Sequence, residues 1–253
     1  MSGLEIAAAA ASAALPGGAP LSGNFPVVEL RQYTLHDGRR GALIDIFERE
    51  FVESQEALGM KVIGTFRDSD RPNRFVWIRG FKDMDARLAG LSAFYSGPVW
   101  QAHRSEANAT MIDSDNVLLL RAPVAVAAFI SKPQRPAIGE RRISGRIVAN
   151  IYEVASPNTD VAELFEQDVL EKLRACGVPV LAWFTTETVE NNYPRLPVRE
   201  GERVLVWFAR FRDDADYEAK RGGIETAVAG LVPLLARDPE VLRLEPTDRS
   251  ELR

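Results

Sequence analysis

The sequence predicts an α+β fold of two tandem ferredoxin-like units, each with the order β-α-β-β-α-β. Two observations predict this fold: the chain repeats itself, and each repeat alternates strand and helix patterns. Residues 59–66, Gly-Met-Lys-Val-Ile-Gly-Thr-Phe, recur as residues 177–184, Gly-Val-Pro-Val-Leu-Ala-Trp-Phe. Residues 76–83, Val-Trp-Ile-Arg-Gly-Phe-Lys-Asp, recur as residues 206–213, Val-Trp-Phe-Ala-Arg-Phe-Arg-Asp.

The first unit begins with a strand at residues 27–34, where side chains alternate between two faces before a turn around Gly38. Apolar residues at helical spacing predict a helix from Arg40 to Leu58, and Gly59 suits the position that ends it. The remaining elements of this unit are expected as strands at residues 60–66 and 74–81, one or two helices within residues 83–107, and a strand at residues 117–121.

The second unit repeats this order with a longer loop, Glu190–Glu202, between its middle strands. Its elements are expected as a strand at 147–154, a helix at 160–175, strands at 178–186 and 203–211, a helix at 213–236 and a strand at 240–245. The domain organisation that follows is a flexible N-terminal arm over residues 1–25, a first unit over 26–122, a linker over 123–146 and a second unit over 147–253.

Each unit would carry helices on one face of an antiparallel sheet, so the opposite face must be buried. The other unit's sheet has the matching shape, and the space between the two sheets is the expected pocket. Closure within one chain and closure between two chains would both cover the bare faces. A homodimer is therefore one of two alternatives.

Composition narrows the class of partner. The net charge of −5 gives no basic footprint, so we expect no nucleic-acid partner. The Ala-rich run near the N-terminus has no Lys or Arg before it and is too short to cross a bilayer, so we expect no membrane span and a cytoplasmic location. Heavy use of Ala and Arg is typical of a bacterial source.

Charged side chains gather on one predicted face of the first unit. Alternation places Glu29, Arg31 and Tyr33 together, and we expect them to face the space between the sheets, because the other set is more apolar. Arg79 would share that space. A carboxylate beside guanidinium groups and a phenol suits a general base, an anion anchor and a hydrogen-bond donor. A structural ion pair with a satisfied tyrosine is the alternative.

Other candidates follow from the same alternation. His103, on the second predicted helix, could transfer a proton, because histidine side chains exchange protons near neutral pH. Large apolar residues on the same faces would either contact a substrate or, as the alternative, belong to the packed core. The candidate substrate-binding set is Lys61, Trp77, Phe81, Asn150, Tyr152, Trp183, Trp207 and Phe211.

We expect neither a metal nor a cofactor. The chain has two histidines and one cysteine, too few for a histidine- or cysteine-based metal cluster, and the second half has no histidine to hold haem. The glycine-rich nucleotide motifs, the zinc-protease motif and the serine-hydrolase motif do not occur.

The segment Val-Glu-Leu-Arg-Gln-Tyr-Thr-Leu at residues 28–35, followed by Leu-Gly-Met-Lys-Val-Ile-Gly-Thr-Phe at residues 58–66, resembles the NIPSNAP family. Residues 81–84 and 98–102 also resemble it, and the second half does so more weakly. The resemblance implies a dimeric α+β barrel. This chain has Trp77 and Arg79 where many relatives have histidine and tryptophan, and Phe81 at a tyrosine position.

Two functions follow as hypotheses. The first is a cofactor-independent enzyme of the isomerase, cyclase or oxygenase type, which holds a hydrophobic aromatic or polyketide-like molecule between the sheets in a biosynthetic pathway. Glu29 would move a proton, Arg31 or Arg79 would hold an oxyanion and Tyr33 would orient the substrate. The second is a non-catalytic NIPSNAP-like binding or scaffold protein with a solid interior, which uses the linker and the Glu190–Glu202 loop as contact surfaces.

Overall fold

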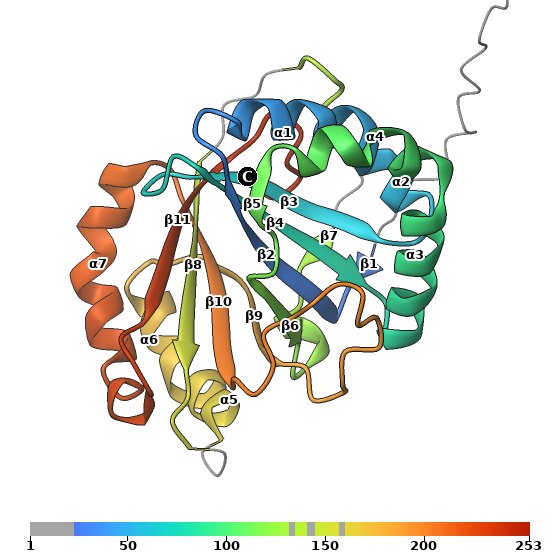
Figure 1. The fold of residues 1–253 in the computed structure, drawn as a ribbon. Coiled ribbons are helices and arrows are strands. Elements are labelled where there is room, and N and C mark those ends of the chain that lie inside the picture. Colours follow the sequence, from blue (N-terminus) through green and yellow to red (C-terminus); the bar gives the residue numbers. More distant parts are fainter. Residues whose placement is uncertain (1–22, 132–134, 141–144, 157–159) are drawn as a thin grey trace, which may run out of the picture.

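A closed antiparallel barrel with helices on its outside forms the body of the molecule (Figure 1). The computed structural model describes residues 23–131, 135–140, 145–156 and 160–253, so the expected N-terminal arm lies almost wholly outside the described residues. Residues Gly23–Asn24 (β1) pair with Ile130–Ser131 (β7) as a small separate sheet.

The first half matches the elements expected from its sequence. It contains β2 (Val27–Leu35), a long helix, β3 (Lys61–Asp68), β4 (Arg74–Phe81) and β6 (Val117–Arg121). The long helix consists of α1 (Arg40–Ile46), a π-helical turn (Phe47–Phe51) and α2 (Val52–Glu56). Two helices, α3 (Met84–Ser96) and α4 (Pro98–Asn108), precede a short strand β5 (Met111–Asp113) that the sequence pattern did not predict.

The second half follows the same order. Its elements are β8 (Arg146–Glu153), α5 (Val161–Leu164), a π-helical turn (Phe165–Val169), α6 (Leu170–Ala175), β9 (Val180–Thr186), β10 (Val204–Phe211), α7 (Asp214–Val228) and β11 (Glu240–Pro246). Short 3-10 turns lie at Ala125–Ala127 and Val232–Leu234. Asp83 and Asp213 cap α3 and α7 at matching positions, since each side chain accepts a hydrogen bond from a backbone N–H in the first turn.

Eight strands complete the barrel in the order β2, β4, β3, β11, β8, β10, β9 and β6, and β6 pairs with β2 again. The two halves meet at two seams. Leu244 of β11 lies opposite Asp68 of β3, and Leu120 of β6 lies opposite Thr186 of β9. The barrel therefore closes within one chain.

Buried apolar side chains fill the barrel. Val28, Leu30 and Ile78 belong to the same core cluster as Val206 and Phe208 of the other half. The ring centroid of Phe129, from the segment between the halves, lies 5.3 Å from that of Phe184 and 5.0 Å from that of Phe208. The space between the two sheets, which the sequence analysis expected to be a pocket, is thus occupied by packed core.

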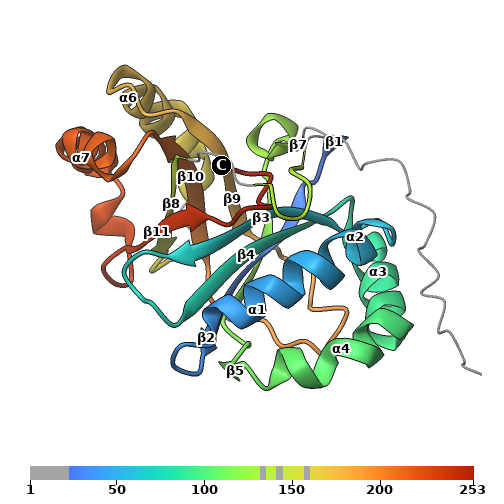
Figure 2. The same ribbon diagram turned by 90° about the horizontal axis from the view of Figure 1, so that it is seen from above.

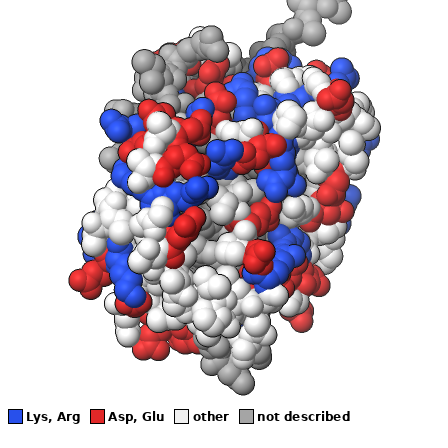
Figure 3. Space-filling view, turned by 90° about the vertical axis from the view of Figure 1, so that its left-hand side faces the viewer, with Lys and Arg blue, Asp and Glu red and all other residues white. Residues whose placement is uncertain are grey.

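The helices form two groups on opposite sides of the barrel, as the view from above shows (Figure 2). Helices α1–α4 cover the strands of the first half, and α5–α7 cover those of the second. On the face at the left of Figure 1, basic and acidic side chains are intermixed (Figure 3). Each helix in the described part of the chain is too short or too polar to span a bilayer.

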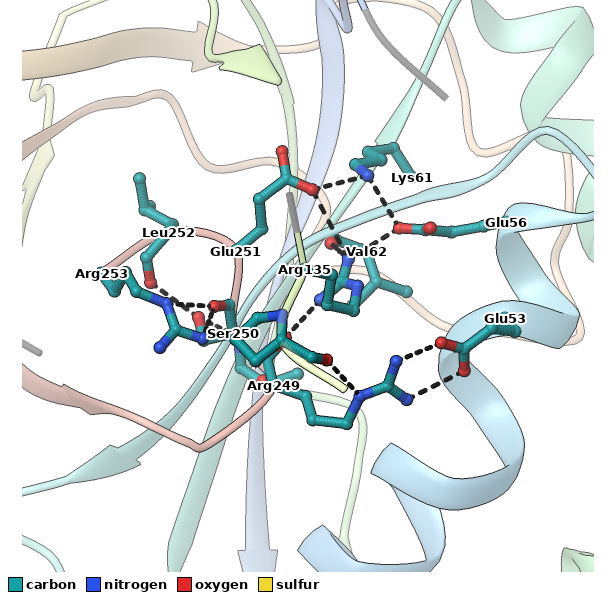
Figure 4. Close-up of polar contacts among 12 residues, drawn as sticks. Glu53, Glu56, Lys61, Val62, Arg135, Arg249, Ser250, Glu251, Leu252 and Arg253 are labelled. Carbon is teal, nitrogen blue, oxygen red and sulfur yellow. Dashed lines mark hydrogen bonds and ion pairs between the residues drawn. The ribbon is translucent and has the colours of Figure 1, made fainter. Parts of the chain in front are cut away.

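Residues 247–253 fasten the second half to the first (Figure 4). The guanidinium of Arg249 pairs with both carboxylate oxygens of Glu53 on α2, and its Nη1 donates to the backbone oxygen of Glu48 at 2.6 Å. The ammonium of Lys61 lies 3.0 Å from Glu56 and 2.6 Å from Glu251. We call residues 247–253 the clasp.

Candidate functional site

The charged residues predicted on β2 lie together, but on the other face of the sheet. Glu29, Arg31 and Tyr33 point toward α2 and α3 and not into the barrel, since Glu29 contacts Arg87 of α3. The expected face was wrong for a physical reason. Apolar core surrounds Val28 and Leu30 in the space between the two sheets, while the helices supply polar partners for Glu29.

The same correction applies to the candidate substrate-binding residues. Trp77 and Phe81 face the helices of the first half, where the guanidinium of Arg79 lies 4.9 Å and 5.5 Å from their ring centroids. Trp183 and Trp207 pack on Phe165 of the second half's helix, and Phe211 packs on Tyr217 of α7. Asn150 and Tyr152 lie opposite Trp207 and Leu205 in the strand register and share their face. The two groups therefore do not meet in one space.

Lys61 is separate from both groups. An irregularity between Val62 and Gly64 breaks the alternation of β3, so Lys61, Ile63 and Thr65 do not share one face as expected. The Lys61 ammonium lies at the clasp, between the carboxylates of Glu56 and Glu251 (Figure 4).

Three buried guanidinium groups surround the carboxylate of Glu29. Arg31 donates to Oε2 at 2.9 Å, and Arg79 donates to the same oxygen through Nε at 3.1 Å and Nη2 at 2.5 Å. Arg87 donates through Nε to Oε1 at 2.8 Å. All four side chains are at most 1% exposed. Among the described residues, Glu29 is the only carboxylate paired with these arginines, so the cluster carries an excess of two positive charges.

The positive surroundings fix the ionisation of the cluster. Burial opposes ionisation of Glu29, but the guanidiniums of Arg79, Arg31 and Arg87 hold its pKa well below the usual range. Burial also acts against the charge of Arg31, yet Tyr33 and Glu29 raise the pKa of Arg31 above its ordinary value. Burial lowers the pKa of Arg87. Glu29 is therefore a fixed carboxylate that organises cations and is poorly suited to accept a proton.

Tyr33 and Trp77 link this cluster to a cavity. The Tyr33 hydroxyl oxygen accepts a hydrogen bond from Arg31 Nε at 2.9 Å, and burial raises the pKa of Tyr33, which keeps the phenol protonated. The indole N–H of Trp77 is buried and has no hydrogen-bond partner among the described residues. Both residues line a cavity of about 40 Å³. Two buried donors thus border a space that holds one or a few water molecules.

Aromatic side chains form most of the cavity wall. Phe47 and Phe51 come from the π-helical turn, and Tyr95 and Trp100 come from either side of the break between α3 and α4. Gln55 adds a polar side chain to the cavity wall. Its Oε1 accepts a hydrogen bond from Arg79 Nη1 at 2.9 Å, which links the cavity to the charged cluster. A flat apolar ligand fits such walls, and its entry would displace the partly exposed rings of Tyr95 and Trp100.

His103 lies at the outer side of these walls. Its ring centroid is 6.4 Å from that of Phe51, and its Nε2 is 3.5 Å from a carboxylate oxygen of Glu50. The side chain is 30% exposed. The structure thus separates His103 from the Glu29 cluster and places it beside a cavity-lining ring.

The second half lacks the charged cluster at equivalent positions. Glu29 lies opposite Arg79 across β2 and β4, whereas Val148 lies opposite Ala209 across β8 and β10. The strands of the second half therefore pair without a charged cluster. Because burying charges costs free energy, the cluster of the first half is not explained by the folding of the barrel alone.

Several residues of the site were missed by the sequence analysis. Arg87 carried a usable signal, because it occupies a position in the apolar stripe of Met84, Leu91 and Phe94 along α3. Gln55 carried the same signal, because it follows the buried Phe51 and Val52 at helical spacing. Asn191 and Asn192 carried none, since contacts made by loop residues from distant segments leave no pattern in one sequence.

The part of the chain that the structure describes contains no set of side chains suited to bind a metal ion. There, no group of three or more His, Cys, Asp or Glu side chains is arranged to hold an ion.

Comparison with known proteins identifies a family for the first half. The NIPSNAP family model matches residues 28–125, so this part of the chain is similar to a NIPSNAP domain. A protein from Burkholderia xenovorans, described as an uncharacterized NIPSNAP-like domain protein, is 22% identical over 45% of this chain and 98% of its own, with a TM-score of 0.39. A search of curated proteins returned no match.

Solved structures resemble the whole barrel at low identity. A proposed monooxygenase from Lactobacillus acidophilus is 12% identical, with a TM-score of 0.57 over 88% of this chain and 94% of its own. An anthrone oxidase-like protein is 13% identical, with a TM-score of 0.51 over 90% of this chain and 94% of its own. These similarities show a shared fold.

Proposed function

We propose that this protein is a cofactor-independent enzyme that acts on a flat aromatic or polyketide-like molecule through an oxyanion. The observation that carries the proposal is the cluster of three buried guanidiniums around one carboxylate, next to an aromatic-walled cavity. Buried cations with too few counter-charges stabilise negative charge nearby. The site lies between the sheet and the helices of the first half, and not between the two sheets.

Tyr33 and Trp77 are the groups that would contact the oxyanion. The Tyr33 oxygen already accepts from Arg31, so its own proton is available for donation, and the Trp77 N–H has no acceptor among the described residues. Two buried donors of this kind beside one cavity resemble the donors that stabilise enolates and phenolates in enzymes. Arg31 strengthens the phenol as a donor by its charge.

The remaining candidates take supporting roles in the proposal. His103 would carry the proton, because it is the imidazole beside the cavity wall. Glu29 would hold Arg31, Arg79 and Arg87 in place and would not move a proton, because its pKa is held well below the usual range. The expected role of Glu29 as a base is thus replaced by positioning.

The comparison between the halves supports a functional role for the cluster. The second half builds the same strands with Val148 and Ala209, so the fold itself does not require the ion pairs. A costly buried cluster in one half is better explained by a ligand than by folding.

The neighbours favour small-molecule chemistry. The proteins compared above are described as a proposed monooxygenase and as anthrone oxidase-like. Oxygenase, isomerase and cyclase reactions on such rings share an enolate or phenolate stage, which this site suits. We place the activity in bacterial, cytoplasmic secondary-metabolite tailoring.

The test is proton exchange on 2-tetralone, an aromatic ketone that forms an enolate. In D₂O the protein should speed the replacement of hydrogen by deuterium at the methylene between ring and carbonyl, measured by proton NMR. Tyr33→Phe should remove most of this acceleration, and the matched Tyr152→Phe should leave it unchanged. A rate equal to that in buffer, or equal rates for wild type and Tyr33→Phe, would contradict the proposal.

A non-catalytic NIPSNAP-like binding or scaffold protein is the second candidate. The filled barrel and the small cavity favour it, since a cavity of about 40 Å³ must widen before it can hold an aromatic ring system. In that case, 2-tetralone exchange would match buffer and no aromatic ligand would bind.

We also propose that the two halves are tandem ferredoxin-like units, with the domain limits given above. In each half the strands are ordered fourth, first, third, second: β6-β2-β4-β3 and β11-β8-β10-β9. This order and the shared element sequence support the assignment.

A further inference from the structure

A loop of the second half reaches the charged cluster of the first. Residues 187–203, which connect β9 and β10, lie against β6, where the backbone N–H of Glu187 donates to Leu119 and that of Arg199 donates to Val117. Arg121 of β6 also pairs with Glu187 at 2.5 Å. Fastened near both ends, this 187–203 loop has a defined position over the first half.

The tip of the loop contacts Arg87 directly. The Nη1 of Arg87 donates to Oδ1 of Asn191 at 3.0 Å and to Oδ1 of Asn192 at 2.7 Å. The amide nitrogen of Asn192 donates to the backbone oxygen of Met84 at 2.6 Å, at the start of α3. The tip therefore holds the one arginine of the cluster that comes from a helix.

The next residue of the loop reaches the cavity wall. The ring of Tyr193 stacks on that of Tyr95, with centroids 6.1 Å apart and planes inclined by 24°. Tyr95 itself lines the cavity and packs on Trp100. The same loop tip thus contacts both the charged cluster and the aromatic wall beside it.

We propose that Asn191 and Asn192 set the charge preference of the first-half site, so that its ligand arrives as an anion. Both residues offer neutral amide oxygens to Arg87, where carboxylates would have cancelled the excess positive charge. The arginine is thereby held in place while its positive charge remains uncancelled in the cluster beside the cavity. This inference rests on the proposed function and narrows its substrate class to aromatic carboxylates, phenolates and enolates.

The experiment compares two probes that differ in charge, 2-naphthoate and the neutral 2-naphthamide, by isothermal titration calorimetry. Wild type should bind 2-naphthoate at least tenfold more tightly. Asn192→Asp should reduce that preference about tenfold, because it adds a negative charge beside Arg87. The matched Asn192→Ala removes the same amide contacts without adding charge, and it should keep most of the preference. An unchanged preference in Asn192→Asp would overturn the inference.

Stability separates this inference from the proposed function. If wild type speeds 2-tetralone exchange but binds neither probe, the inference is overturned and the proposed function stands. If wild type does neither, the proposed function fails, and urea unfolding then decides the role of the loop. Asn192→Asp should be more stable than Asn192→Ala at pH 7, because the added carboxylate pairs with a cluster that has excess positive charge. Equal stability of the two variants would overturn the inference in that case.

Discussion

Trp77 and Trp207 occupy equivalent places in the two halves, Trp77 opposite Arg31 on β2 and Trp207 opposite Asn150 on β8. Each indole is buried against the helices of its own half. Only Trp77 borders a charged cluster. Substitutions of Trp77 and Trp207 can therefore separate the effect of the cluster from the effect of core packing.

Replacing Trp77 by Phe should weaken the binding of 2-naphthoate about tenfold, because the variant removes a buried N–H donor and keeps an aromatic ring. Trp207→Phe should leave the affinity unchanged. Calorimetric titration of both variants measures the difference. Equal losses in the two variants would mean that the effect comes from packing and not from the donor.

Replacing Glu29 by Gln should lower the free energy of unfolding by about 3–5 kcal/mol, because three buried guanidiniums would lose their counter-charge. Glu218→Gln is the control, since Glu218 and its partner Arg221 are both exposed and water can replace the lost pairing. Urea unfolding that shows equal losses would contradict this account.

Alkaline pH should destabilise the protein through Tyr152. Burial raises the pKa of Tyr152 to about 12 from an ordinary value of 10.0. The folded state therefore holds the proton more tightly, and the stabilisation is complete below pH 10 and is lost as the pH rises toward 12. At pH 11 this group alone should lower the free energy of unfolding by about 1 kcal/mol. Tyr152→Phe should show a smaller decline between about pH 8 and 11, and an identical decline would contradict the assignment.

Replacing Arg249 by Met should lower the free energy of unfolding by about 2 kcal/mol, since the buried guanidinium satisfies backbone oxygens of Glu48 and Pro136 and pairs with Glu53. The exposed Arg237 provides the control, and Arg237→Met should change stability by less than about 0.5 kcal/mol. Thermal and urea unfolding of both variants would measure this. A negligible loss in Arg249→Met would mean that the clasp adds little.

The order of strands and helices could be predicted from the sequence because periodicity and repetition record local structure. The alternation of β2 indicated that Glu29, Arg31 and Tyr33 share a face of the sheet. It did not indicate the strand register that places Glu29 opposite Arg79, which only the structure shows. Which face is buried against helices depends on what the rest of the chain supplies. The apolar stripes of the helices place Arg87 and Gln55 toward the sheet, but the pairing of these residues with Glu29 and Arg79 is visible only in the structure.

The clasp has a consequence for synthesis of the protein. Strand β3 pairs with β11, and residues 247–253 then fasten on α2, so the first half's sheet is completed by residues translated after nearly all of the second half. Until β11 and the clasp have left the ribosome, one edge of that sheet has no partner strand. An unpaired edge attracts other chains. The nascent first half is therefore exposed to aggregation for the time that the ribosome needs to translate the second.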